Sequence, residues 1–228
     1  MSPPCSDQRS DRLLVTTPTG DARLIIDRAP DRARATVVLG HGASGGAGAR
    51  DLVALAAALP PGGITVVRVE QPWRVAGKRM ASAPVVLDRG WLGAVAQLGA
   101  HVEHTEVLIV GGRSAGARVA CRTAVALGAA GCLALAFPLH PPGRPGVSRL
   151  PELVAAGVPT LVVQGERDAF GGPEHVGVHG SDLPPGSAII AMPGADHSFA
   201  VLRSAPLSQG QLLDRLVTAV RAWCSTLL

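Results

Sequence analysis

The sequence of 228 residues contains no tyrosine, and aromatic residues make up only 3% of it. Lys78 is its single lysine, so arginine carries almost all of the positive charge. The net charge of +4 is scattered among acidic residues, with no long basic run and no interleaving of basic and aromatic side chains. Nucleic acid is therefore not an expected partner. The hydrophobic fraction of 47% can still form a sizeable core, built mainly from Ala, Val and Leu.

Paired cysteines and long apolar runs are also missing. Cys5, Cys121, Cys132 and Cys224 lie far apart and form no C-x-x-C motif. Cys121 and Cys132 fall in apolar segments, which favours buried free thiols in a reducing compartment. Residues 1–11 lack the apolar stretch of a signal peptide, and no run approaches the ~18 apolar residues of a membrane span. We therefore expect a cytoplasmic protein without a membrane partner, and a disordered tail at residues 1–11.

Strand and helix patterns alternate along residues 12–228. Two strand patterns, 12–16 and 22–27, flank a turn and predict an antiparallel hairpin. The apolar runs that follow alternate with helical patterns, which is typical of buried parallel strands joined by helices. These further strands are predicted at 35–39, 64–69, 107–111, 132–137, 159–164 and 187–192, and the helices at 49–59, 84–101, 115–127, 149–156 and 208–227. The sequence predicts one α/β domain, a three-layer sandwich around a mostly parallel eight-stranded sheet with an antiparallel N-terminal hairpin.

The pentapeptide Gly112-Arg113-Ser114-Ala115-Gly116 directly follows the apolar run 107–110 and matches G-x-S-x-G. A strand, a sharp turn with a serine at its tip and a helix together form a nucleophile elbow, which exposes the serine hydroxyl. Only glycine-sized residues fit two positions before and after such a serine, and the N-terminus of the helix favours a developing oxyanion. Ser114 is therefore the predicted nucleophile. The alternative is a glycine-rich turn with an incidental serine.

A serine nucleophile needs a general base, and the base needs a carboxylate that orients it. In chain order these partners are expected on loops beyond the carboxyl ends of later strands, the acid first and the histidine second. Asp168 and His197 follow the predicted strands 159–164 and 187–192 in this way. We predict Ser114 as nucleophile, Asp168 as orienting acid and His197 as general base. Glu166, which lies closer to the strand, and Asp196, which neighbours His197 in sequence, are rival acids. An exposed loop histidine is the alternative for His197.

The glycine-rich stretch 40–46 follows the predicted strand 35–39 and is the expected source of a second oxyanion donor. We predict that the backbone N–H groups of Ala43 and Ala115 form the oxyanion hole. The stretch also matches the dinucleotide motif G-x-G-x-x-G, for which Glu70 is the only acidic residue at the end of the next strand. Dinucleotide binding is therefore an alternative for the stretch 40–46, but for no other part of the sequence. We expect the protein to use no cofactor.

Five side chains near these loops are candidates for substrate binding: His41, Trp73, Arg79, Arg113 and His140. Trp73 and Arg79 lie in the predicted loop 71–83, which could select anionic or amphipathic acyl groups; a solvated loop with one packed tryptophan is the alternative. Arg113 could contact a substrate carboxylate or support neighbouring loops, and His140 could make a structural hydrogen bond instead. No set of side chains shows the spacing of a metal site, so none is predicted.

Four segments resemble one group of α/β hydrolases: GHGASG at 40–45, GGRSAGAR at 111–118, FPLHPP at 137–142 and HSFAV at 197–201. The group is similar to dienelactone hydrolases and includes a testis-expressed protein and a subunit of a histone-acetyltransferase complex. The resemblance extends from about residue 36 to the C-terminus. It implies a serine hydrolase fold without a lid, with Ser114, Asp168 and His197 at matching positions. Dienelactone hydrolases proper carry cysteine at the position of Ser114, so their substrate is not carried over.

Together these observations predict a serine hydrolase that cleaves a small ester or thioester through an acyl-serine intermediate. Its partner would be a small-molecule acyl substrate. The piece between residues 137 and 159, about 20 residues, is too short for a lid domain, so residues 12–228 are expected to form one lid-less domain. The alternative is a hydrolase-fold binding or scaffold protein with little or no catalysis, as in some members of the group. The sequence leaves monomer and homodimer open.

Overall fold

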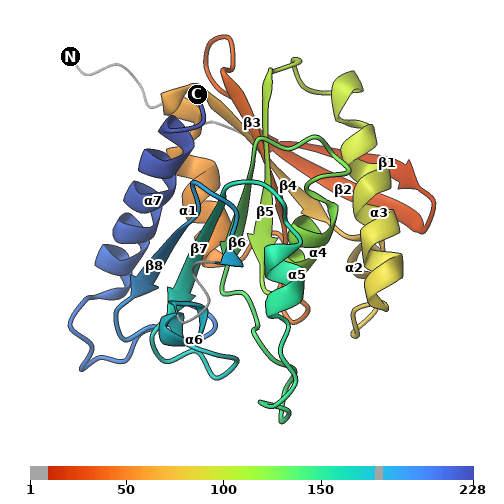
Figure 1. Cartoon of the computed structure of the whole chain (residues 1–228). Helices are drawn as coiled ribbons and strands as arrows, with labels where there is room; N and C mark the ends of the chain where they lie inside the picture. Colours follow the sequence, from red (N-terminus) through yellow and green to blue (C-terminus); the bar gives the residue numbers. More distant parts are fainter. Residues whose placement is uncertain (1–9, 178–181) are drawn as a thin grey trace, which may run out of the picture.

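Eight strands form one sheet in the computed structural model, which describes residues 10–177 and 182–228 (Figure 1). Its order is β1-β2-β4-β3-β5-β6-β7-β8. The strands are β1 (Asp11–Thr17), β2 (Gly20–Asp27), β3 (Ala35–Gly40), β4 (Ile64–Glu70), β5 (Val107–Arg113), β6 (Gly131–Leu135), β7 (Thr160–Gly165) and β8 (Ala188–Met192). Only the pairs β1–β2 and β2–β4 are antiparallel. The predicted mostly parallel, eight-stranded sheet with an N-terminal hairpin is thus confirmed.

Helices cover both faces of the sheet and explain why its central strands are apolar along their length. In Figure 1, α1 (Arg50–Ala58) and α7 (Gln209–Ser225) lie on one side, and α3 (Pro84–Ala96), α4 (Ala115–Thr123) and α5 (Leu150–Val154) on the other. Successive residues of a strand point to opposite faces, so Val38 joins the core under α3 and α4 while Leu39 joins the core under α1 and α7. Two apolar cores therefore hold the three layers together.

Several boundaries differ from the sequence predictions. β1 begins at Asp11, which was assigned to the tail; the rest of that predicted tail, residues 1–9, lies outside the described residues. The helix predicted at 84–101 ends at Ala96 and continues as a separate 3-10 turn, Leu98–Ala100. The helix predicted at 115–127 ends at Thr123, because the chain then turns and closes at Gly128 with a φ of +62°.

Two short helices occur where no helix was predicted. α2 (Pro72–Val75) lies in the predicted loop 71–83 and α6 (Pro173–Gly177) follows β7; each begins with proline, which suits the first turn of a helix. Over the part of the chain that the structure describes, no helix is both long and apolar enough to cross a lipid bilayer.

Candidate active site

Ser114 lies at the tip of a tight turn between β5 and α4. Its backbone has φ +55° and ψ −111°, in a region that residues with a Cβ rarely adopt and that costs on the order of 1–3 kcal/mol. Hydrogen bonds hold the turn on both sides: the N–H of Ser114 donates to the carbonyl of Leu135 at 2.9 Å, and its carbonyl accepts from the N–H of Arg118 at 3.1 Å. The half-buried serine thus sits at the N-terminal end of α4.

Close packing against β3 explains the two glycines that flank the serine. A Cβ added at Gly112 or Gly116 would lie closer than 3.0 Å to the backbone of Gly40. The Gly112 Cβ would also lie 2.8 Å from the carbonyl carbon of Gly116. Backbone atoms in a buried parallel sheet cannot move aside cheaply, so both positions exclude a side chain. The predicted need for glycine is confirmed, and the main obstacle is the end of β3.

The side chains of Ser114, His197 and Asp168 form a chain of hydrogen bonds. Nε2 of His197 lies 2.9 Å from Oγ of Ser114, and Nδ1 of His197 lies 2.8 Å from Oδ2 of Asp168. A carboxylate can only accept, so Nδ1–H donates to Asp168 and leaves Nε2 to accept the serine proton. The Asp168 side chain is fully buried and that of His197 is 20% exposed. The arrangement can therefore draw a proton from the serine hydroxyl toward an imidazole held in one tautomer.

The two rival carboxylates face other partners. Oε2 of Glu166 accepts a hydrogen bond from the N–H of Gly194 at 2.9 Å. Oδ1 of Asp196 accepts from the N–H groups of Ser198 and Ala200 at 2.7 and 2.9 Å, within its own loop. Both acids thus shape the loop that carries His197. Of the three carboxylates considered in the sequence, Asp168 is the one that the structure brings to the imidazole.

Gln164 and Phe170 surround Asp168 and were not found from the sequence. Gln164 is a fully buried residue of β7, and its Nε2 lies 3.0 Å from Oδ2 of Asp168. The N–H of Phe170 donates to the other oxygen, Oδ1, at 2.8 Å. The Phe170 ring meets the His197 imidazole edge-on, with 4.5 Å between ring centroids. A polar glutamine directly after the apolar run 161–163 was the signal that could have pointed to this support.

Two backbone N–H groups near the serine are free to donate. Among the described residues, neither Ala43 nor Ala115 donates its N–H to a backbone carbonyl or a side chain. Ala115 is the first residue of α4, where N–H groups have no partner inside the helix. Ala43 is an exposed residue of the stretch Gly40–Gly46, called the glycine loop below. Their predicted oxyanion role remains a prediction, and their free N–H groups are compatible with it.

His41 and Trp73 lie inside the protein. His41 is 3% exposed; its Nδ1–H donates to the carbonyl of Gly42 at 2.8 Å, and its Nε2 accepts from the N–H of Gln71 at 3.1 Å. Burial lowers the pKa of His41, which keeps the ring neutral and able to accept at Nε2. The Trp73 ring packs beside it at 5.5 Å between centroids. His41 and Trp73, both predicted to contact the substrate, instead pack the glycine loop against α2 in this structure.

The other three predicted substrate contacts differ in exposure. Arg113 is buried and its guanidinium contacts protein groups: Nη2 donates to the carbonyl of His197 at 2.6 Å, and Nε lies 3.3 Å from Oδ2 of Asp51. Arg79 is exposed, in the segment that follows α2. His140 is half-buried, with its ring 6.4 Å from that of Phe170. Arg79 and His140 are therefore the two with surface accessible to a ligand.

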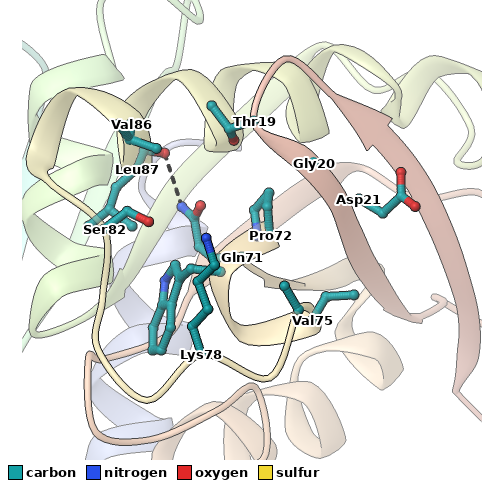
Figure 2. A pocket seen from close by; sticks show the side chains of 12 residues that line it. Thr19, Gly20, Asp21, Gln71, Pro72, Val75, Lys78, Ser82, Val86 and Leu87 are labelled. Atoms are coloured by element: carbon teal, nitrogen blue, oxygen red, sulfur yellow. Dashed lines mark hydrogen bonds between the residues drawn. The ribbon is translucent and has the colours of Figure 1, made fainter.

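A cavity of about 250 Å³ lies beside α2, between the hairpin turn and the start of α3 (Figure 2). Figure 2 shows Gln71 at its wall, where Nε2 donates to the carbonyl of Leu87 at 3.2 Å. Trp73 lines the cavity, but Ser114, Asp168 and His197 do not. Across the described ranges, no group of three or more His, Cys, Asp or Glu side chains is placed to hold a metal ion.

Comparison with known proteins places this fold in a family. A model of the alpha/beta hydrolase domain matches residues 33–225. The chain belongs to the alpha/beta hydrolase family. This hydrolase resembles, with 26% identity and a TM-score of 0.72, an a/b serine hydrolase without a lid from Xanthomonas campestris; the match covers 97% of this chain and 98% of that one.

Two further solved structures share the hydrolase fold at lower identity. A serine hydrolase homologue from Coxiella burnetii matches with 19% identity and a TM-score of 0.73 over 96% of this chain and 100% of its own. A thermophilic esterase from Thermogutta terrifontis matches with 18% identity and a TM-score of 0.66 over 96% and 99%. A search of curated protein sequences finds no match.

Proposed function

We propose that this chain is a serine hydrolase that cleaves a small ester or thioester through an acyl-Ser114 intermediate. The observation that carries the proposal is the unbroken hydrogen-bond chain from Oδ2 of Asp168 through His197 to Oγ of Ser114. The strained turn holds the hydroxyl in place at a helix N-terminus, and serine hydrolases are among the solved structures that the chain resembles.

In the acylation step, Oγ of Ser114 forms a bond to the carbonyl carbon of the substrate while Nε2 of His197 takes the hydroxyl proton. The carbonyl electron pair moves onto its oxygen, which accepts hydrogen bonds from the N–H groups of Ala43 and Ala115. The Asp168 carboxylate stabilises the imidazolium that results. The tetrahedral intermediate then expels the alcohol or thiol, which leaves with the proton that His197 returns to it.

In the deacylation step, a water molecule takes the place of the leaving group. Nε2 of His197 removes a proton from the water as its oxygen bonds to the acyl carbon. Collapse of the second tetrahedral intermediate breaks the bond to Oγ of Ser114, and His197 returns the proton to that oxygen. The products are a carboxylic acid and the free enzyme, and the cycle consumes one water molecule.

We further propose an open, lid-less site that favours small acyl groups. Between β6 and β7 the only helix is α5, five residues long, and the similar hydrolase from Xanthomonas campestris is also described as lacking a lid. Arg79 and His140 are the proposed rim contacts for the substrate, because both have accessible surface. The group that resembles dienelactone hydrolases, with the testis-expressed protein and the acetyltransferase-complex subunit, is the proposed subfamily.

A fluorophosphonate probe tests the proposed nucleophile, because it phosphonylates a serine only where a base activates it. We expect the native protein to be labelled, Ser114→Ala to abolish labelling, and His197→Ala to slow it by about 10³-fold or more. Ser198→Ala is the matched control, since Ser198 is an exposed serine next to the histidine. A folded wild-type protein that stays unlabelled would contradict the proposal and support the binding or scaffold role.

A further inference from the structure

The guanidinium of Arg113 contacts three segments of the proposed site. Nη2 donates to the backbone carbonyl of His197 at 2.6 Å. Nε forms an ion pair of 3.3 Å with Oδ2 of Asp51, near the start of α1. Nη1 lies beside the glycine loop, where a Cβ added at Gly42 or Gly45 would come within 3.7 and 3.9 Å of it. One buried side chain from the serine turn therefore reaches the histidine loop, the start of α1 and the glycine loop.

Asp51 is the only carboxylate to which the structure pairs Arg113 within the described residues, and it is fully buried. Burial raises the pKa of Asp51, and the Arg113 charge opposes that rise. A buried ion pair adds little net stability compared with apolar side chains of similar size, although breaking one by removing a single partner is costly. Packing alone therefore does not explain why this position carries two charges. Nε of Arg113 and the Asp51 carboxylate form an ion pair without a hydrogen bond, so Asp51 supplies a charge that anchors the guanidinium. The direction comes from Nη2, whose hydrogen bond fixes the His197 carbonyl.

We propose that Arg113, anchored by Asp51, is a positioning residue that holds His197 and the glycine loop in register with Ser114. The inference rests on the proposed hydrolase function. His197 receives its orientation at the ring from Asp168 and Phe170, and at its backbone carbonyl from Arg113. The same guanidinium lies against the loop that presents the N–H of Ala43. Because Arg113 directly precedes Ser114, its contacts fix the positions of the base and of the oxyanion donor relative to the nucleophile.

The size of the expected effect follows from the sensitivity of catalysis to geometry. A misplacement of about 1 Å in a catalytic group costs about 100-fold in rate. Loss of the Arg113 contact leaves Asp168 and Ser114 in place, so substrate binding should change little while the chemical step slows. A positioning role thus predicts a fall in kcat with a nearly constant KM. A merely structural role predicts that activity follows the fraction of folded protein.

Three variants separate these roles. Arg113→Lys keeps the charge next to Asp51 but loses the fork that reaches the His197 carbonyl. Asp51→Asn keeps the shape of the anchor and removes its charge. The double variant Asp51→Leu/Arg113→Met replaces the ion pair with apolar side chains. This restores the free energy of unfolding but not the hydrogen bond to the His197 carbonyl. Kinetics with p-nitrophenyl acetate give kcat and KM, and urea unfolding gives the stability of each variant.

The pair formed by Arg122 and Asp88 provides matched controls. Its bidentate hydrogen bonds, 2.9 and 2.6 Å, join α4 to α3, and both side chains are about one-fifth exposed. Arg122→Lys and Asp88→Asn make the same chemical changes as the test variants, in the helix layer on the other face of the sheet. We expect both controls to keep kcat within about twofold of the wild type, since neither residue contacts the three loops.

We expect Arg113→Lys, Asp51→Asn and the double variant each to lower kcat about 10- to 100-fold with KM within about twofold. The double variant should do so while unfolding at a urea concentration close to that of the wild type. A folded double variant with wild-type kcat overturns the positioning role, and so does unchanged kcat in Arg113→Lys if the double variant fails to fold. A wild-type protein without esterase activity instead contradicts the proposed function, so the two failures are distinguishable.

Discussion

The amide nitrogen Nε2 of Gln164 lies 3.0 Å from Oδ2 of Asp168, the oxygen that also faces Nδ1 of His197. The same amide group lies 2.6 Å from the carbonyl of Gly171 and 3.2 Å from that of Phe137. A residue of the rigid central sheet therefore fixes the loop that carries the acid. This contact orients the carboxylate before any substrate binds, which is a requirement for efficient proton transfer.

Gln164→Leu tests this support. The leucine fills a similar volume but donates no hydrogen bond, so Asp168 loses a donor and two buried carbonyls lose a partner. We expect a loss of about 1–3 kcal/mol in the free energy of unfolding and a fall of about 10-fold in kcat. Urea unfolding and esterase kinetics measure the two effects. Gln97→Leu, at an exposed helix end, is the control, and equal behaviour of the two variants would contradict the assigned contact.

The close approach of Gly116 to Gly40 gives a second prediction. A Cβ at Gly116 meets backbone atoms that cannot move, so Gly116→Ala should lower the free energy of unfolding by about 3 kcal/mol or prevent folding. Gly210→Ala is the control, because a Cβ there meets nothing within 4 Å and Gly210 lies in α7. The control should gain about 0.5 kcal/mol, since alanine loses less entropy in a helix. A stable Gly116→Ala protein would contradict the packing described for the turn.

The neutral, buried His41 predicts how stability depends on pH. Burial lowers the pKa of His41 from its ordinary value of 6.5. Just below pH 6.5 the unfolded chain therefore binds a proton at His41 that the folded chain does not bind. The free energy of unfolding should therefore fall as pH drops from 6.5 toward the lower folded pKa, by at most about 1.4 kcal/mol per pH unit from this group. Above pH 6.5 His41 should contribute no pH dependence.

Urea unfolding between pH 7.5 and 5 checks this sign. His41→Gln should be less sensitive to acid than the wild type, because glutamine keeps an acceptor for the N–H of Gln71 and does not titrate. His140→Gln is the control for replacing a histidine near the site. If His41→Gln loses stability with the same slope as the wild type below pH 6.5, the buried neutral state of His41 is wrong.

The buried thiols predict slow chemical modification. Sγ of Cys121 lies 3.7 Å from Sγ of Cys132, and this contact together with burial raises the pKa of Cys121. Burial raises the pKa of Cys224 to about 12. Thiolates are the reactive species, so Cys121 and Cys224 should stay unmodified by an aromatic disulfide reagent at pH 8, and the fully buried Cys132 is shielded from the reagent. With Cys5→Ser as background, modification should follow global unfolding, whereas rapid reaction of the native protein would contradict this burial.

Much of the fold was predictable because the strands of this sheet are apolar runs with clear breaks. Ala35 to Leu39 and Thr160 to Gln164 read as buried strands from composition alone, and their order along the chain implied parallel pairing. Helix ends were less predictable. The four-residue α2 contains too few positions to show a period, and α4 ends at Thr123 although the helical pattern continues. Such ends depend on tertiary packing rather than on local propensity.

The residues of the candidate site also divide into those that the sequence predicts and those that only the structure shows. Ser114 and His197 stand in short patterns whose spacing is visible in the sequence, and the choice of Asp168 over Glu166 followed from its distance beyond the strand. Asp51 was missed because it acts across the fold, 62 positions before Arg113 in the printed numbering. Gln164 was missed although it is only four positions before Asp168, because a single polar residue at a strand end does not show which group it contacts. A lone aspartate in the first turn of a helix reads as a favourable helix dipole contact, and only the structure shows its partner.

Trapping the acyl intermediate tests the central claim most directly. The protein is mixed with p-nitrophenyl acetate, quenched in acid within the first turnovers and digested, and the peptide that contains Ser114 is analysed by mass spectrometry. We predict one acetyl group on Ser114 in the wild type, its accumulation in a variant with slowed deacylation, and none in Ser114→Ala. Ester turnover by the wild-type protein that persists in Ser114→Ala, with no acetyl group on Ser114, would contradict the account.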